Sequence, residues 1–85
     1  MAGRIEQYRR SMIGALIRER KRKGLSQETV ASRMGIQRSN LSRFECGEQN
    51  TTLDYFFRYA EALGLEPDIV WKEKRSPAVN DISSE

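Results

Sequence analysis

The chain has 85 residues, of which 38% are hydrophobic and 32% charged, so it holds one small domain at most. Its single cysteine and its lack of histidine exclude an intrachain disulfide, a histidine-ligated metal and catalysis by a Ser-His-Asp or Cys-His set. No apolar run approaches the roughly 18 residues of a membrane span, and no signal peptide is recognisable. We therefore expect a non-enzymatic, cytoplasmic domain that binds no metal or cofactor and no membrane.

Charge is distributed unevenly along the chain. Residues 1–23 hold eight Lys or Arg and two Glu, whereas residues 48–85 hold four Lys or Arg and eight Asp or Glu. A basic front and an acidic rear are typical of a molecule with one face for a polyanion. Solvated helix faces would produce the same asymmetry, so charge alone leaves nucleic-acid binding open.

The spacing of apolar residues predicts a long first helix. Its apolar positions recur at helical intervals, at Ile13, Leu16 and Ile17, and Arg20 is next in phase. The last turn is rich in Lys and Arg, which suits the negative end of a helix, and Gly24 follows as a stop.

Residues 1–11 are open to two interpretations. A similar apolar stripe continues upstream through Ile5, Tyr8 and Met12, which makes these residues an extension of the first helix. Ser11 is also a good N-cap, in which case they form a loose basic arm of the kind that reaches into a minor groove. We favour the extension.

Four further short helices are predicted downstream, over residues 27–34, 38–46, 53–63 and 67–71. N-caps precede them at Ser26 and Thr52, glycines stop them at Gly35, Gly47 and Gly64, and Pro67 suits a first turn. No run alternates in the manner of a half-buried strand. The sequence thus predicts an all-α, five-helix domain over 12–71, with Ile69 and Val70 in its core, and a flexible polar tail over 72–85.

The predicted helix over 38–46 has one face that suits DNA. At about 100° per residue, Leu41 and Phe44 fall on one side, and the other side carries Arg38, Ser39, Ser42 and Arg43. A helix about 10–12 Å wide fits the roughly 12 Å major groove, where guanidiniums fork onto guanine and hydroxyls reach base or phosphate. An ordinary amphipathic surface helix would look the same, so this helix alone does not decide the function.

Three stretches carry a more specific signal: IGALIRERKRKGLSQ, ETVASRMGIQRSNLSRFECG and TLDYFFRYAEALGL. They contain the pair Ser26-Gln27, the spacing Ala31 to Gly35, and an S-R-x-E-x-G ending over 42–47. In these features residues 13–65 closely resemble the Cro and phage-repressor (XRE) family of helix-turn-helix regulators. The resemblance implies a lambda-repressor-like fold and a transcriptional regulator, more often a repressor, that reads the major groove with the helix 38–46.

The resemblance also implies roles for individual residues. The DNA-binding positions it indicates are Gln27, Gln37, Arg38, Ser39, Asn40, Ser42 and Arg43. It matches Arg20 and Glu45 to a structural ion pair between the first helix and the recognition helix. The residues themselves agree, because Arg20 lies in phase with the core stripe and a charge on a core face needs a partner.

The chain departs from the family pattern at three places. Gln37 stands where Ser or Thr usually caps the recognition helix, so its side chain is expected to point to a base instead. Thr29 replaces the Glu of a capping box. The loop after the recognition helix carries Glu48 and Thr51 in place of a basic residue and a proline, which weakens the expectation of phosphate contacts there.

Three functions remain to be distinguished. The first is a regulator that binds double-stranded DNA as a homodimer on a two-fold operator, because one small domain reads few base pairs. The second is an antitoxin that binds a toxin through its acidic rear half and also represses its own promoter. The third is a pure protein-interaction module. Cys46 fits an inert thiol better than a redox sensor. Trp71 and the pair Tyr55 and Tyr59 fit either a core or a dimer surface.

Overall fold

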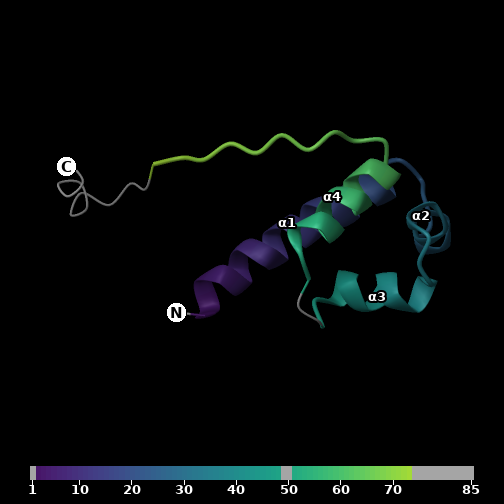
Figure 1. Ribbon diagram of the computed structural model, residues 1–85, viewed down its shortest axis with the longest axis horizontal. Helices are drawn as coiled ribbons and strands as arrows, with labels where there is room; N and C mark the ends of the chain where they lie inside the picture. Colours follow the sequence, from purple (N-terminus) through teal and green to yellow (C-terminus); the bar gives the residue numbers. More distant parts are fainter. Residues whose placement is uncertain (1, 49–50, 74–85) are drawn as a thin grey trace.

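Four α-helices make up the described part of the chain, residues 2–48 and 51–73, in this computed structural model (Figure 1). They are α1 (Ala2–Arg22), α2 (Gln27–Met34), α3 (Arg38–Cys46) and α4 (Leu53–Ala62). None of these residues forms a strand. The predicted all-α class is therefore confirmed, and α2 and α3 have the predicted bounds.

The prediction of a fifth helix over 67–71 is wrong, because the chain runs extended after α4 (Figure 1). Five residues are too few to repay the cost of helix nucleation without a surface to pack on. Leu63 and, in part, Leu65 pack against the core at the end of α4. Ile69 and Val70 consequently lie exposed, so the prediction that they belong to the core is also wrong.

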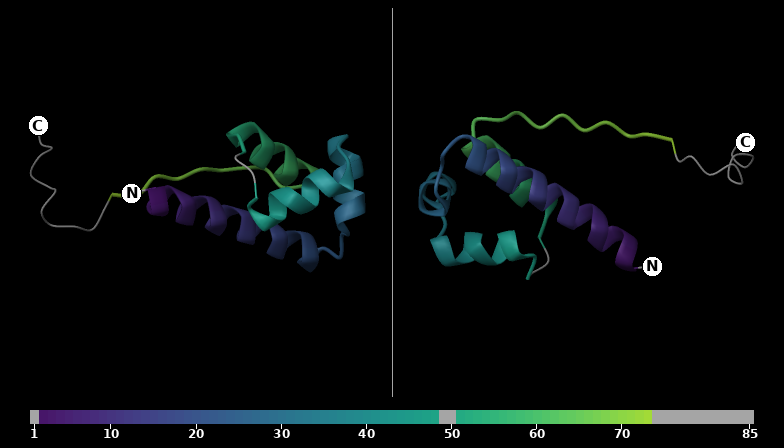
Figure 2. Two further views of the ribbon diagram at one scale, coloured as in Figure 1. Left: turned by 90° about the horizontal axis from the view of Figure 1, so that it is seen from below. Right: turned by 180° about the vertical axis from the view of Figure 1, so that it is seen from behind.

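Residues 2–11 belong to α1, so of the two interpretations the chain adopts the helix extension. Glu6 pairs with Arg9 and Arg10 at helical spacing, which supports the first turns. This half of α1 projects beyond the other helices (Figures 1 and 2). The predicted tail over 72–85 lies mostly outside the described residues, since only its first two positions fall within them.

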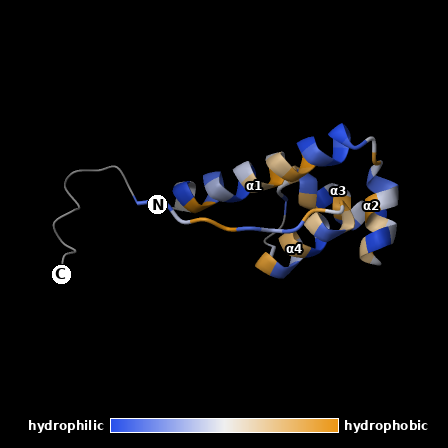
Figure 3. Ribbon diagram, turned by 90° about the horizontal axis from the view of Figure 1, so that it is seen from above, coloured by the Kyte–Doolittle hydropathy of each residue, from blue (hydrophilic) through white to orange (hydrophobic). Residues whose placement is uncertain are grey.

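Phe44 of α3 forms the centre of an aromatic cluster in the core. Its ring centroid lies 4.7 Å from that of Tyr55, 5.3 Å from that of Phe56 and 5.5 Å from that of Tyr59. Such tilted and edge-on pairs add to the stabilisation from burial. The middle of α1 and much of α4 are hydrophobic where they border this core, whereas the C-terminal end of α1 is strongly hydrophilic (Figure 3).

The turn between α2 and α3 depends on its capping residues. The Ser26 hydroxyl accepts a hydrogen bond from the Thr29 backbone N–H (3.0 Å) and so begins α2 as predicted. Gly35 ends α2 with φ of 73°, in the left-handed region that residues with a Cβ rarely adopt. Because only three residues then separate α2 from α3, this cap sets how the two helices meet.

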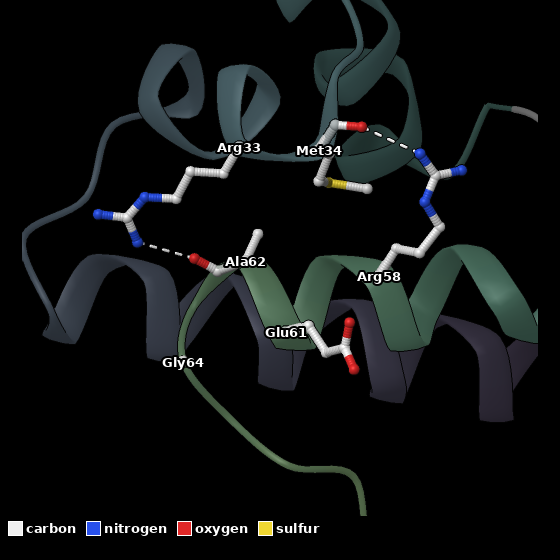
Figure 4. A pocket seen from close by; sticks show the side chains of 6 residues that line it. All are labelled: Arg33, Met34, Arg58, Glu61, Ala62 and Gly64. Atoms are coloured by element: carbon white, nitrogen blue, oxygen red, sulfur yellow. Dashed lines mark hydrogen bonds between the residues drawn. The ribbon is translucent and has the colours of Figure 1, made fainter.

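Two arginines brace α2 against α4 at a surface cleft (Figure 4). Arg33 of α2 donates to the Ala62 carbonyl (2.8 Å), and Arg58 of α4 donates to the Met34 carbonyl (3.0 Å). Each guanidinium thus satisfies a carbonyl at the C-terminal end of the opposite helix, where a positive charge is favoured. Nothing in the sequence pattern indicated this exchange.

Candidate nucleic-acid interface

α3 presents the polar face that the sequence predicts. Leu41 and Phe44 are buried against the core. The predicted DNA-binding positions lie outside that core. Gln37, Arg38, Ser39 and Arg43 are exposed, and Asn40, Ser42 and Gln27 are half-buried. The exposed side of the helix therefore offers two guanidiniums, a hydroxyl and a carboxamide to whatever lies against it.

The N-terminal ends of α2 and α3 are joined by a side-chain hydrogen bond. Arg38 donates from Nη1 to Gln27 Oε1 at 3.0 Å. Both residues stand at the first position of their helices, where free backbone N–H groups and the helix dipole favour an anion. A DNA phosphate placed here would meet the Arg38 charge as well as these amides.

Gln37 and Arg43 differ in how they are held. The Gln37 side chain makes no capping hydrogen bond, although its backbone has the extended conformation of an N-cap. Arg43 donates from Nη2 to Asn40 Oδ1 at 3.0 Å, one turn back along α3. Asn40 therefore orients the Arg43 guanidinium on the exposed face.

Arg20 and Glu45 form an ion pair inside the domain, between α1 and α3. The Nε–Oε2 distance is 2.9 Å, and Nη2 donates to Oε1 at 3.1 Å, so the pair is bidentate. Only 9% of the Arg20 side chain and 6% of the Glu45 side chain are exposed. Arg20 also donates to the Leu25 carbonyl at 2.9 Å, which fixes the chain between α1 and α2.

The Glu45 carboxylate accepts two further hydrogen bonds that the sequence did not reveal. They come from Gln27 Nε2 (3.0 Å) and from the Tyr59 hydroxyl of α4 (2.5 Å). Burial opposes ionisation, but these hydrogen bonds and the Arg20 charge outweigh it and hold the pKa of Glu45 below its ordinary value. Burial and the Glu45 charge together raise the pKa of Tyr59, so the hydroxyl keeps its proton.

The basic residues of α1 are partly neutralised within the helix. Arg22 pairs with Glu19 at 2.9 Å, and Arg9 and Arg10 pair with Glu6. Arg18, Lys21 and Lys23 are exposed. Lys21 stands in the last turn of α1 and Lys23 directly after it, where a positive charge suits the helix dipole.

The described residues offer neither a metal-binding cluster nor a membrane-spanning helix. Over residues 2–48 and 51–73, His, Cys, Asp and Glu form no group of three that would hold a metal ion. None of the helices in this part of the chain is long and apolar enough to cross a membrane. Cys46 is exposed at the end of α3.

Comparisons with known proteins point to one family. The model of the family described as Helix-turn-helix matches residues 16–70. The uncharacterized HTH-type transcriptional regulator y4dJ of Sinorhizobium fredii is 39% identical over 57 residues, which are 66% of this chain and 74% of that protein. Antitoxin HipB of Escherichia coli is 33% identical over 58 residues, 68% of this chain and 66% of HipB. No solved structure matches the chain significantly. Since the family match covers more than half of the chain and includes α2, α3 and α4, the protein belongs to the helix-turn-helix family of DNA-binding transcriptional regulators.

Proposed function

We propose that the protein is a transcriptional repressor that reads operator DNA in the major groove with the exposed face of α3. The observation that carries this proposal is that this face lies next to two helix N-termini, which a side-chain hydrogen bond joins. Arg38 and Gln27 join the N-terminal ends of two helices at 3.0 Å, directly beside the exposed α3 residues. A phosphate held there would fix the register of α3 in the groove.

The proposed contacts divide into two groups. Gln27 and Arg38, at the helix N-termini, hold the DNA backbone. Arg43, one turn further along α3, reaches a base edge, where its fork suits guanine O6 and N7. Gln37, Ser39, Asn40 and Ser42 complete the surface, with the uncapped Gln37 as a second base reader. A repressor of this kind acts by binding DNA and needs no catalytic group. It would act in the cytoplasm, where the DNA lies.

We further propose that two copies bind a two-fold operator, because a single recognition helix reads only a few base pairs. The surface that would join them begins at an apolar groove between α1 and α4. The groove is lined by Met12, Leu16, Phe56 and Phe57 among others. The exposed side chains of Ile5 and Tyr8 continue it as an apolar stripe along the projecting half of α1. The extended segment 66–73 passes beside the groove and exposes 74% of Val70 and 87% of Trp71.

Charge supports a second copy as the occupant of this surface. The projecting half of α1 carries Arg4, Arg9 and Arg10 against Glu6, whereas segment 66–73 carries Glu66, Asp68 and Glu73 against Lys72. When α1 of one copy meets segment 66–73 of the other, opposite charges lie together. In a two-fold pair this contact occurs twice, which is the self-complementarity that an isologous interface needs.

The test is selection of bound sequences from random duplex DNA, followed by light scattering of the complex. We expect one enriched motif with two-fold symmetry, two chains per duplex, and affinity that falls steeply with salt. If no sequence is enriched and DNA affinity does not depend on salt concentration, the proposal is contradicted and a protein-interaction module remains. An asymmetric motif with one chain per duplex would contradict the dimer only.

An antitoxin is a second candidate function, favoured by the similarity to HipB. In that case the acidic rear half would bind a toxin while α3 binds the promoter. Purification of the tagged protein from its native host, with the mass of every stoichiometric partner determined, distinguishes the two. A small partner that stops growth when expressed alone, and not when expressed with this chain, would identify an antitoxin. Recovery of the chain only with itself and DNA would favour the plain repressor.

A further inference from the structure

We infer that Tyr59, a core residue of α4, is a positioning residue for the DNA-binding groups at the N-terminal ends of α2 and α3. The inference rests on the proposed function, because it assigns Gln27 and Arg38 to the DNA backbone. Tyr59 itself is fully buried and touches no DNA. It would act through a chain of hydrogen bonds that leads from the core to the surface.

The hydrogen-bond network centres on Glu45, whose two carboxylate oxygens accept from four donor groups. Tyr59 and Arg20 Nε donate to Oε2, at 2.5 and 2.9 Å. Gln27 Nε2 and Arg20 Nη2 donate to Oε1, at 3.0 and 3.1 Å. With donors on both oxygens from three other elements, the carboxylate has one orientation in which all four hydrogen bonds form.

The orientation of Glu45 then dictates that of Gln27. An ionised carboxylate only accepts, so the Gln27 amide must turn its nitrogen towards Glu45. Its oxygen consequently faces the other way, where it accepts from Arg38 Nη1 at 3.0 Å. The Arg38 guanidinium is therefore held at the start of α3 by a sequence of contacts that runs from Tyr59 through Glu45 and Gln27.

The hydroxyl of Tyr59 is separable from its ring. The ring packs against Phe44 with centroids 5.5 Å apart, and phenylalanine would keep this contact. Loss of the hydroxyl alone leaves Oε2 with Arg20 as its remaining donor, so the carboxylate shifts within its bidentate pair. Gln27 follows the displaced Oε1, and Arg38 is held less firmly before it meets a phosphate.

Tyr55 provides a matched control on the same helix. Its ring lies 4.7 Å from that of Phe44, and its hydroxyl is buried without a hydrogen-bond partner among the described residues. Tyr55→Phe and Tyr59→Phe thus remove the same atom from the same cluster, and only the second reaches Glu45. A difference between the two variants reports the hydrogen bond rather than the loss of a hydroxyl from the core.

The decisive experiment is a double-mutant cycle on the selected operator duplex, well below the melting temperature of each variant. We expect Tyr59→Phe to weaken binding about fivefold and Tyr55→Phe to leave it unchanged. In a Gln27→Ala background, Tyr59→Phe should have no further effect, because the link to Arg38 is already broken. The side-chain amide of Gln27 gives a readout without DNA: its NMR signals should move in Tyr59→Phe and stay in place in Tyr55→Phe.

Three results would overturn the inference. The first is unchanged operator affinity in Tyr59→Phe. The second is an equal loss of affinity on Tyr59→Phe in the parent and in the Gln27→Ala background. The third is that the Gln27 amide signals do not move when the Tyr59 hydroxyl is removed. If the parent protein binds no duplex at all, the proposed function fails instead. The amide signals would still show in that case whether Tyr59 positions Gln27.

Discussion

Glu45 illustrates, at the scale of single residues, which parts of the site a sequence reveals. Arg20 falls in phase with the apolar stripe of α1, so its need for a buried partner is visible in the sequence, and the family motif points to Glu45. The hydrogen bonds from Gln27 and Tyr59 were not predicted. They join helices whose relative placement no local pattern encodes, and the sequence left Tyr59 open between the core and a dimer surface.

Removal of the Glu45 carboxylate should strongly destabilise the domain. Glu45→Ala leaves Arg20 as a buried charge without its counterion, so we expect the free energy of unfolding to fall by about 3–5 kcal/mol. Urea unfolding followed by circular dichroism measures the change. Glu6→Ala removes an exposed carboxylate that also pairs with arginines, and should cost far less. Melting of Glu45→Ala within a degree or two of the parent would show that the pair contributes little.

The same carboxylate should make stability depend on acid. The pKa of Glu45 is lower in the folded chain than its ordinary value of 4.5, so the unfolded chain takes up a proton first as the pH falls. The free energy of unfolding should therefore decrease as the pH drops below about 4.5 and level off below the folded pKa. Urea titrations at pH 6, 4.5 and 3.5 should show a smaller decrease in Glu45→Gln; equal decreases would argue against Glu45 as the source.

Arg38 and Arg43 should respond differently to substitution. Arg38→Ala removes a phosphate contact, so it should weaken binding to every duplex and flatten the log–log salt dependence by about 0.9. Arg43→Ala removes a base contact worth about 1–3 kcal/mol of discrimination, so it should relax the preference at one operator position per half-site. Operator and scrambled duplexes, titrated across a salt series, separate these effects. Equal losses on both duplexes for Arg43→Ala would leave Gln37 as the better candidate for base reading.

At the scale of elements, the caps and glycines made the helices predictable. Ser26, Gly35 and Gly47 delimit α2 and α3, whose predicted bounds are those observed. A helix was wrongly predicted over 67–71 because the proline and apolar residues of this segment satisfy the local rules for a helix start. Whether such a short segment becomes helical depends on tertiary packing, and here Ile69 and Val70 stay exposed beside the groove between α1 and α4.

Two glycines should respond to alanine with opposite signs. Gly35 has φ of 73°, and a Cβ there would meet open space, so Gly35→Ala should cost about 1–2 kcal/mol from backbone strain alone. Gly14 lies inside α1, where a Cβ would meet only the Arg18 guanidinium at 3.7 Å. Gly14→Ala should therefore stabilise the protein by about 0.5–1 kcal/mol. Thermal denaturation of both variants tests the pair, and destabilisation by Gly14→Ala would contradict the expectation that a Cβ is accommodated there.

At the scale of the whole molecule, one side carries α3, the proposed DNA-binding helix, and the other carries the extended segment with its exposed apolar residues. α3 lies on one side of α1 and α4, and the extended segment lies on the other (Figures 1 and 2). The family motifs predict the first side, because they encode its residues directly. On the second side Ile69 and Val70 were predicted as core and Trp71 as either core or dimer surface, since exposed and buried apolar residues look alike in a sequence.

A charge placed in the apolar groove should separate the two proposed copies. Met12→Glu puts a carboxylate beside Leu16 and Phe56, and Met12 is exposed enough for the fold to survive. We expect a monomer at concentrations where the parent is a dimer, with weaker binding to a two-fold operator, as measured by analytical ultracentrifugation and titration. Gln7→Glu adds the same charge about 140° around α1 and should change neither. A Met12→Glu dimer would place the interface elsewhere.

The exposure of Trp71 also gives the protein a built-in optical reporter. It is the sole tryptophan, its ring stands almost entirely in water, and it belongs to the extended segment after α4. An indole in water emits at longer wavelength than one enclosed by apolar groups, so the colour of the protein's fluorescence reports on this one position. Dilution of a dimer that encloses Trp71 would shift the emission to the red, whereas docking of α3 on DNA would leave the wavelength unchanged. Assembly and DNA recognition can thus be followed separately in one cuvette, without any label.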